Sequence, residues 1–131
     1  MSENEIGEWL DEGRRVLIEA SEALVRLADR LNLEQWATAV RLVRDTRGRL
    51  VITGMGKSGA VGRKLASTFA STGTHALFLH PAEAVHGDLG MLAPGDTVIA
   101  LSYSGETDEL RTLLPGIGRL GVPIIGITGN L

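Results

Sequence analysis

Three short segments, rich in glycine and hydroxyl side chains, carry the residue types that bind small anions and move protons. The first, residues 54–59, reads GMGKSG and places Lys57 where a helix is expected to begin. A cation there opposes the positive end of the helix dipole, which is unfavourable unless an anion compensates. Gly56, Lys57 and Ser58 therefore predict a bound phosphate or carboxylate.

Two alternatives for the GMGKSG segment stay open. It matches the G-x-G-x-x-G pattern of dinucleotide sites, but those sites require an acidic residue at the end of the next strand. Here that strand ends with Leu79, His80 and Pro81. The second alternative is that the glycines only let a strand and a helix approach closely. A P-loop is disfavoured, because Val51 stands where its first glycine is required.

The second segment, residues 102–107, reads SYSGET and follows a predicted strand. Hydroxyls such as those of Ser102, Ser104 and Thr107, clustered at the free amides of a helix start, bind anions without a basic side chain. The alternative is simple capping by Ser104 with Thr107 at the third position, which would employ only one hydroxyl. The segment therefore predicts a phosphate site.

The third segment, residues 80–90, reads HPAEAVHGDLG and is expected to form a loop. His86, followed by Gly87 and Asp88, could transfer protons with the carboxylate orienting the ring. His80 and Glu83 could add metal ligands, but a strand-end residue and a surface charge explain them better, so no metal site is predicted.

Acidic residues lie at the end of the second segment and directly after it, near the first turn of the helix expected there. Glu106, Asp108 and Glu109 would stabilise the helix dipole in any protein. The alternative is that one of them is a catalytic carboxylate, and the residues alone leave that choice open.

The elements that must position these segments alternate along the chain. Four continuous apolar runs are typical of strands buried on both faces, and they begin at Leu50, Ala76, Thr97 and Val122. Helices are expected over about 58–71 and 107–120. This alternation predicts an α/β fold, a flavodoxin-like three-layer structure with a parallel sheet in the order 2-1-3-4. Ligands of such sheets bind beyond the carboxyl ends of the strands, where all three segments lie.

Two helices are expected before the sheet. Apolar side chains on the first are predicted to form one buried stripe: Val16, Leu17, Ala20, Leu24, Leu27 and Leu31. Asn32 and Gln35 predict a capping box that opens the second, and Gly48 is expected to end it. We therefore expect residues 1–49 to be a helical segment that packs on an α/β domain of residues 50–131. That domain is expected to be incomplete at its C-terminus, because a covering helix normally follows such a fourth strand.

Composition narrows the class of protein. The 131 residues suffice for one domain, the net charge of −3 provides no basic surface for nucleic acid, and the absence of cysteine excludes disulfides and thiolate zinc sites. The acidic N-terminus lacks the positive start of a signal peptide, and no apolar run approaches the roughly 18 residues of a membrane span. A cytoplasmic protein without nucleic-acid or membrane partners is expected.

Together the three segments resemble the sugar isomerase (SIS) domain, and more narrowly the arabinose-5-phosphate isomerases of the KpsF/GutQ type. Residues 62–74 and 78–81 add to the resemblance, which runs from about residue 12 to the end of the chain. The resemblance implies an aldose–ketose isomerase that converts D-arabinose 5-phosphate to D-ribulose 5-phosphate through an enediol, without a cofactor. That reaction supplies the eight-carbon acid sugar of lipopolysaccharide or capsule. A homo-oligomer, dimer or tetramer, is also implied.

The resemblance assigns the catalytic positions to Lys57, His86 and Glu109. Glu109 would be the base that shuttles the proton, Lys57 would stabilise oxyanion charge, and His86 would assist ring opening or hydroxyl proton transfer. The phosphate is implied to bind at Gly56, Ser58, Ser102, Ser104 and Thr107. A further catalytic histidine of the family lies beyond residue 131, so this chain is expected to bind phosphosugar but to isomerise it poorly.

A phosphosugar sensor without catalytic activity is the rival class within the same domain family. Such regulators keep the serine segment but need not keep Lys57, His86 and Glu109, so the joint presence of these three favours an enzyme. Tyr103 stands where many relatives have a small polar residue, which could change the packing of that loop.

Overall fold

The computed structural model describes residues 2–130, which divide after Thr38 into two compact units. The first contains helix α1 (Glu3–Arg30) and the start of α2 (Leu33–Arg44). A capping box begins α1: the Ser2 hydroxyl accepts the backbone N–H of Glu5, and the Glu5 carboxylate accepts that of Ser2. These hydrogen bonds lower the pKa of Glu5.

The apolar stripe of α1 is not buried, contrary to the prediction. No described residue of this helix is buried, and Leu17 and Leu24 are 73% and 67% exposed. The charged side chains pair within the helix, as Arg15 does with Glu12 and Glu19. Within the described residues of this unit, α1 therefore presents an apolar face that the unit itself does not cover. Among residues 2–130, no helix is long and apolar enough to cross a bilayer.

Helix α2 begins at the predicted cap residue, although among the described residues only one of the two hydrogen bonds of a capping box is present, and it ends earlier than predicted. The backbone N–H of Gln35 donates to Asn32 Oδ1 at 3.0 Å, whereas the last helical residue is Arg44 rather than one next to Gly48. A Cβ on Gly48 would collide with the side chain of Asp96. Glycine is therefore required there by close packing and not by the end of a helix.

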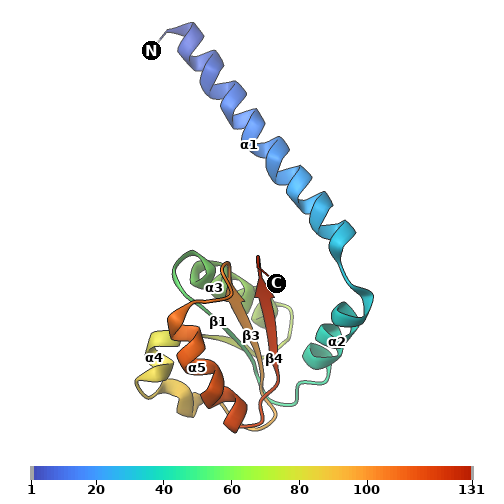
Figure 1. Cartoon of the computed structure of the whole chain (residues 1–131), viewed down its shortest axis with the longest axis vertical. Coiled ribbons are helices and arrows are strands. Elements are labelled where there is room, and N and C mark those ends of the chain that lie inside the picture. The colour runs from blue at the N-terminus through green and yellow to red at the C-terminus, as the bar shows by residue number, and fades with distance from the viewer. Residues whose placement is uncertain (1, 131) are drawn as a thin grey trace. The chain divides into compact units, whose positions relative to one another are not determined.

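The second unit is built on a parallel sheet, drawn in Figure 1. Its strands are β1 (Leu50–Gly54), β2 (Ala76–Leu79), β3 (Thr97–Ser102) and β4 (Ile124–Thr128). The strand order is β2-β1-β3-β4 with every pair parallel, which confirms the predicted order.

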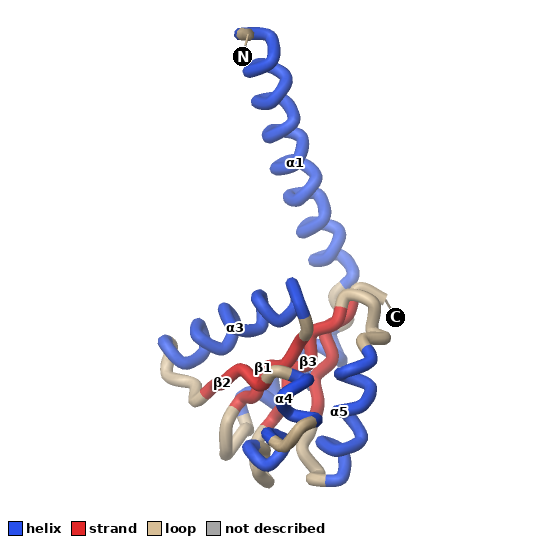
Figure 2. The backbone as a smooth tube through the Cα atoms, turned by 90° about the vertical axis from the view of Figure 1, so that its left-hand side faces the viewer, coloured by secondary structure: helices blue, strands red, loops and turns tan. Residues whose placement is uncertain are grey.

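Helices cover both faces of this sheet, as the three-layer prediction requires. Helix α3 (Gly56–Ser71) lies on one face, and α4 (Pro81–Val85) and α5 (Asp108–Arg119) lie on the other (Figure 2). Strand β1 supplies both cores, because successive side chains point to opposite faces. Leu50 and Ile52 belong to the cluster with Ala66 of α3, and Val51 belongs to the cluster with Leu110 and Leu113 of α5.

Strand β4 departs from the prediction of burial on both faces. Four of its five residues are exposed, including Ile124 and Ile127. Among the described residues β4 pairs only with β3, whereas β1 and β3 each have two neighbouring strands. A continuous apolar run is thus expected of a central strand, but an edge strand can have the same run.

The segment expected to be a loop after β2 is largely helical. It forms α4 and a 3₁₀ turn, η1 (Asp88–Met91), with His86 as the C-cap residue of α4. Pro81 occupies the first turn of α4, where its missing N–H costs no hydrogen bond. Proline just after a strand was the signal for this helix.

Candidate active site

The three segments meet at one edge of the sheet. Residues 54–59 begin at the last residue of β1, residues 80–90 follow β2, and residues 102–107 begin at the last residue of β3. Because the strands are parallel and in register, these segments all leave the sheet at its carboxyl end. The structure therefore confirms their common location.

The first segment uses its glycines for backbone reasons. Gly56 has φ +53°, a conformation that side chains disfavour, and a Cβ on Gly59 would lie 2.6 Å from the carbonyl oxygen of Gly54. Close approach of strand and helix thus accounts for these two glycines. It does not account for Lys57, which is exposed in the first turn of α3, or for the half-buried Ser58 beside it.

The second segment is a closed turn of hydroxyl groups. Ser102 Oγ and Thr107 Oγ1 are 2.8 Å apart, and Ser102 Oγ accepts the backbone N–H of Gly105 at 3.0 Å. Ser104 Oγ accepts the N–H of Glu106 at 3.2 Å. Gly105 has φ +74°, as this tight turn requires.

The cap of α5 differs from simple capping by Ser104. Thr107 is the N-cap residue, and its side chain makes no capping hydrogen bond because it faces Ser102. The first-turn amides of α5 consequently gain no side-chain acceptor from the cap residue. This leaves them available to an anion at the carboxyl edge.

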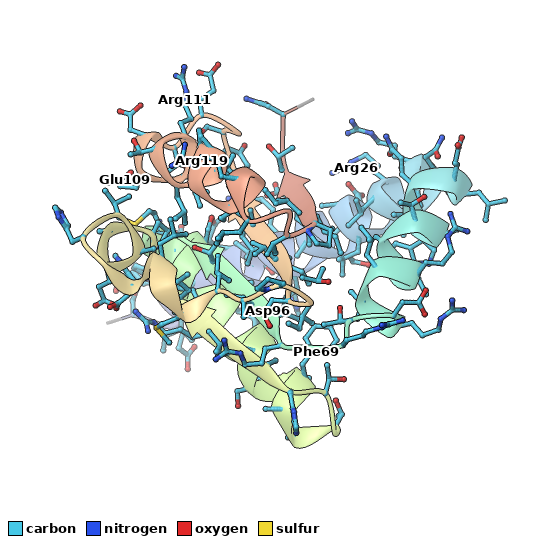
Figure 3. All side chains as sticks on the ribbon, turned by 90° about the horizontal axis from the view of Figure 1, so that it is seen from below. Arg26, Phe69, Asp96, Glu109, Arg111 and Arg119 are labelled. Atoms are coloured by element: carbon cyan, nitrogen blue, oxygen red, sulfur yellow. The ribbon has the colours of Figure 1, made fainter. Side chains whose placement is uncertain are left out.

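The predicted catalytic residues come from three different elements on two faces of the sheet. Lys57 is on α3, exposed His86 ends α4, and half-buried Glu109 lies in the first turn of α5. Glu109 projects from α5 at the side of the molecule that carries α4 (Figure 3), and these two helices are in contact. Within residues 2–130, none of the three side chains has a hydrogen-bond or ion-pair partner. All three are therefore uncommitted to the fold.

Metal and dinucleotide chemistry find less support at this edge. Among the described residues, no group of three or more His, Cys, Asp or Glu side chains could hold a metal ion. His80 directly follows β2, as the strand-end interpretation predicted. A dinucleotide site requires an acidic residue at the end of β2 to bind the ribose, and the sequence has none at that position.

Sequence analysis missed one polar group at this edge, Thr53, and treated a second, His80, only as a strand-end residue. Thr53 Oγ1 and His80 Nδ1 are buried without a hydrogen-bond partner. Thr53 falls within a predicted apolar strand, and only its neighbours in the folded chain show that its hydroxyl lacks a partner. The sequence offers one clue to its role: Thr53 directly precedes the GMGKSG segment.

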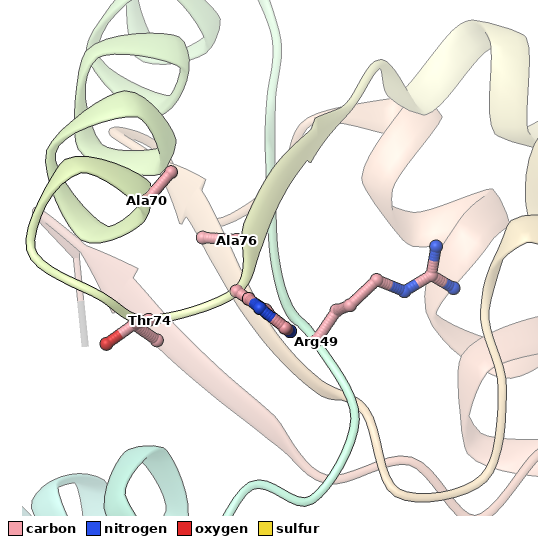
Figure 4. Close-up of a pocket in the computed structure, with 5 residues that line it drawn as sticks. Arg49, Ala70, Thr74 and Ala76 are labelled. Atoms are coloured by element: carbon pink, nitrogen blue, oxygen red, sulfur yellow. The ribbon is translucent and has the colours of Figure 1, made fainter.

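A hollow at the opposite edge of the sheet is lined by none of the predicted catalytic or phosphate-binding residues. It has a volume of about 270 Å³ and is lined by Arg49, Ala70, Thr74, His75 and Ala76 (Figure 4). The Arg49 guanidinium is occupied, since it donates to the carbonyl oxygen of Met91 and pairs with Asp96. His75 is exposed there.

Comparisons with known proteins agree on one domain type. The SIS domain model matches residues 42–131. The chain is 49% identical over 117 residues to the arabinose 5-phosphate isomerase KpsF of Escherichia coli and 50% identical over 118 residues to KdsD of E. coli K12. These matches cover 89% and 90% of the chain, which spans 36% of either relative's length.

A solved structure extends this likeness to three dimensions. The E. coli CFT073 protein c3406, solved in complex with arabinose 5-phosphate, superimposes with a TM-score of 0.84 at 38% sequence identity. The match covers 98% of this chain and 66% of that one.

Proposed function

The chain belongs to the SIS domain family, and we propose that it is the isomerase portion of an enzyme that interconverts D-arabinose 5-phosphate and D-ribulose 5-phosphate. The observation that carries the proposal is the near 50% identity to arabinose 5-phosphate isomerases over about nine-tenths of the chain. It is supported by the common edge of Lys57, His86 and Glu109, which a sensor would not require. A phosphorylated pentose does not cross membranes, so we propose a cytoplasmic setting.

The proposed phosphate site is the hydroxyl turn beside the start of α5. Ser102 and Thr107 share one hydrogen bond, so one hydroxyl hydrogen stays available to a ligand. Ser104 accepts a backbone N–H and can still donate its own hydroxyl hydrogen. Gly56 and Ser58, in the first turn of α3, would add backbone and hydroxyl donors from the neighbouring loop. Holding the remote phosphate orients the sugar carbons toward the catalytic groups.

The proposed chemistry is one proton transfer between carbons with a matching transfer between oxygens. Once the ring is open, the Glu109 carboxylate removes the C2 proton of the aldose, and the electron pair forms a C1–C2 double bond with negative charge on O1. The Lys57 ammonium stabilises that charge. Returning the proton to C1, while His86 moves the hydroxyl proton from O2 to O1, yields the ketose. The sequence is redox-neutral and consumes no co-reactant.

The experiment that tests the function is calorimetric titration of the chain with arabinose 5-phosphate, ribulose 5-phosphate, glucosamine 6-phosphate and NAD. Binding of the two pentose phosphates with turnover between them is expected. Preference for glucosamine 6-phosphate without turnover would instead favour a sensor. Preference for NAD would favour a dinucleotide protein.

The serine turn is expected to supply much of the phosphate affinity. Ser104→Ala should weaken arabinose 5-phosphate binding by roughly 1–3 kcal/mol, the usual effect of losing a hydrogen bond to a charged group. Ser71→Ala is the matched control, because that hydroxyl is exposed at the far end of α3 and donates only to the Thr68 carbonyl. Unchanged affinity in Ser104→Ala, measured by titration, would mean that the phosphate binds elsewhere.

We also propose that the chain self-associates through α1. Four exposed leucines follow one another at seven-residue steps: Leu10, Leu17, Leu24 and Leu31. That spacing is the one at which two copies of a helix pack side by side. Exposed Trp9 and Val16 widen the same face, which favours a bundle of more than two helices.

Sedimentation at tens of micromolar tests this association. A dimer or tetramer is expected for the unchanged chain, and Leu17→Glu combined with Leu24→Glu should shift it to monomer. Ile18→Glu is the control, since Ile18 is also exposed and apolar but lies on the other side of Leu17 from Val16, roughly 200° around the helix from Val16. A compact monomer of the unchanged chain would contradict the proposal and indicate that the stripe packs elsewhere within it.

A further inference from the structure

Two buried side-chain atoms in the described part of the chain lack a hydrogen-bond partner, Thr53 Oγ1 and His80 Nδ1. Thr53 is the fourth residue of β1 and pairs with Leu79, the last residue of β2. His80 lies just beyond β2, and its ring packs edge-on against Phe78. Both atoms therefore lie at the carboxyl edge, with the three predicted site segments. Buried polar groups in folded proteins nearly always have partners, so an unpartnered one needs a reason.

Thr53 is the sharper case because it is completely buried. Valine has the same shape and would fill the position without leaving a hydroxyl unpaired in the core. A second buried threonine in the same sheet provides the contrast. Thr97 begins β3 at the opposite edge, and its hydroxyl lies 2.7 Å from that of Thr46. The buried threonine hydroxyl at the amino edge of the sheet thus has a hydrogen-bond partner within the fold, whereas the one at the carboxyl edge has none.

The position of Thr53 connects it to the proposed catalytic groups. Its side chain points to the same face as Val51, because alternate strand residues share a face, and that face is covered by α4 and α5. Helix α4 ends at His86, and α5 carries Glu109 in its first turn. In the sheet, Thr53 lies between Leu79 of β2 and Ala100 of β3. Its hydroxyl therefore lies beneath the helices that carry two of the three catalytic groups.

We propose that Thr53 is a positioning residue of the sugar site, whose hydroxyl pairs with a sugar hydroxyl, or with a water held by it, when phosphosugar binds. The inference rests on the proposed function. The phosphate turn begins at Ser102, two residues beyond Ala100 along β3, so Thr53 acts on the sugar and not on the phosphate.

The test compares Thr53→Val, Thr53→Ser and Thr97→Val in the full chain, by titration with arabinose 5-phosphate and with inorganic phosphate and by thermal unfolding. For Thr53→Val we expect the Kd for arabinose 5-phosphate to rise about three- to tenfold, the effect of one neutral hydrogen bond. The Kd for inorganic phosphate should be unchanged, Tm should not fall, and Thr53→Ser should restore affinity. Thr97→Val should lower Tm and leave both Kd values unchanged.

Three outcomes would overturn the inference. If Thr53→Val and the unchanged chain bind arabinose 5-phosphate with equal affinity, this inference is refuted while the proposed function stands. If Thr53→Val lowers Tm and weakens the binding of arabinose 5-phosphate and of inorganic phosphate equally, Thr53 is a structural residue. Failure of the unchanged chain to bind arabinose 5-phosphate would overturn the proposed function, and this inference with it. With 2-deoxyribose 5-phosphate, loss of the Thr53→Val effect identifies the C2 hydroxyl as the partner, and its persistence identifies another hydroxyl or the bound water.

Discussion

Replacing Glu109 with Gln is expected to lower the isomerisation rate by about 10²- to 10⁴-fold, the usual contribution of one general base. Glutamine keeps the shape and hydrogen-bonding length of the side chain but cannot accept a proton from carbon. Because Glu109 has no partner among the described residues, the substitution breaks no contact of the fold. Affinity for arabinose 5-phosphate should stay within about threefold, since the phosphate binds through other residues.

The measurement is deuterium uptake into the sugar in D₂O, followed by NMR, because carbon–hydrogen exchange reports proton abstraction even when net turnover is slow. Glu106→Gln is the matched control. Glu106 is an exposed acid three residues before Glu109, just ahead of α5, and is assigned no catalytic role. Exchange that is lost in Glu106→Gln and kept in Glu109→Gln would mean that the wrong carboxylate has been assigned. Exchange lost in neither would remove both from the mechanism.

Replacing Asp96 with Ala is expected to destabilise the α/β unit by about 3 kcal/mol. Asp96 is 2% exposed and lies at the amino end of the sheet, just before β3 (Figure 3). Its carboxylate accepts the backbone N–H groups of Arg49 at 2.7 Å and Ala93 at 3.0 Å, and the Arg49 guanidinium lies 3.4 Å away. Alanine would leave these donors without their acceptor and loosen the junction between β1 and β3.

Thermal unfolding measures this effect, and a fall in Tm of about 10 °C is expected for a domain of this size. Asp45→Ala is the control. Asp45 pairs with the Arg44 guanidinium at 2.7 and 2.9 Å, which lowers the pKa of its carboxyl, but the pair is exposed to solvent. Solvent screening makes such pairs weak, so Tm should barely change. Equal changes in the two variants would show that burial of Asp96 does not strengthen its contacts.

The sequence by itself was sufficient for the order of the strands and the longer helices, and for the edge of the sheet at which the candidate site lies. Short apolar runs separated by amphipathic stretches allow only a parallel sheet with crossover helices, and the chain direction then sends every strand end to one edge. The segments after β1, β2 and β3 could therefore be assigned to one edge of the sheet before any distance was known. Lys57 at a helix start and the hydroxyl cluster of residues 102–107 were visible for the same reason, because their chemistry is local.

Only the tertiary structure decided which of these side chains make hydrogen bonds within the fold and which remain available to a ligand. Burial of β4 could not be predicted, because an apolar run does not reveal whether a second strand or helix covers it. Thr107, not Ser104, proved to be the cap, since the side-chain contact with Ser102 depends on how the turn closes. Thr53 and Thr97 are the same residue type in similar strands, and only their neighbours distinguish a satisfied hydroxyl from an unsatisfied one. Hydrogen-bond satisfaction is a property of groups brought together from distant parts of the chain, which no local pattern records.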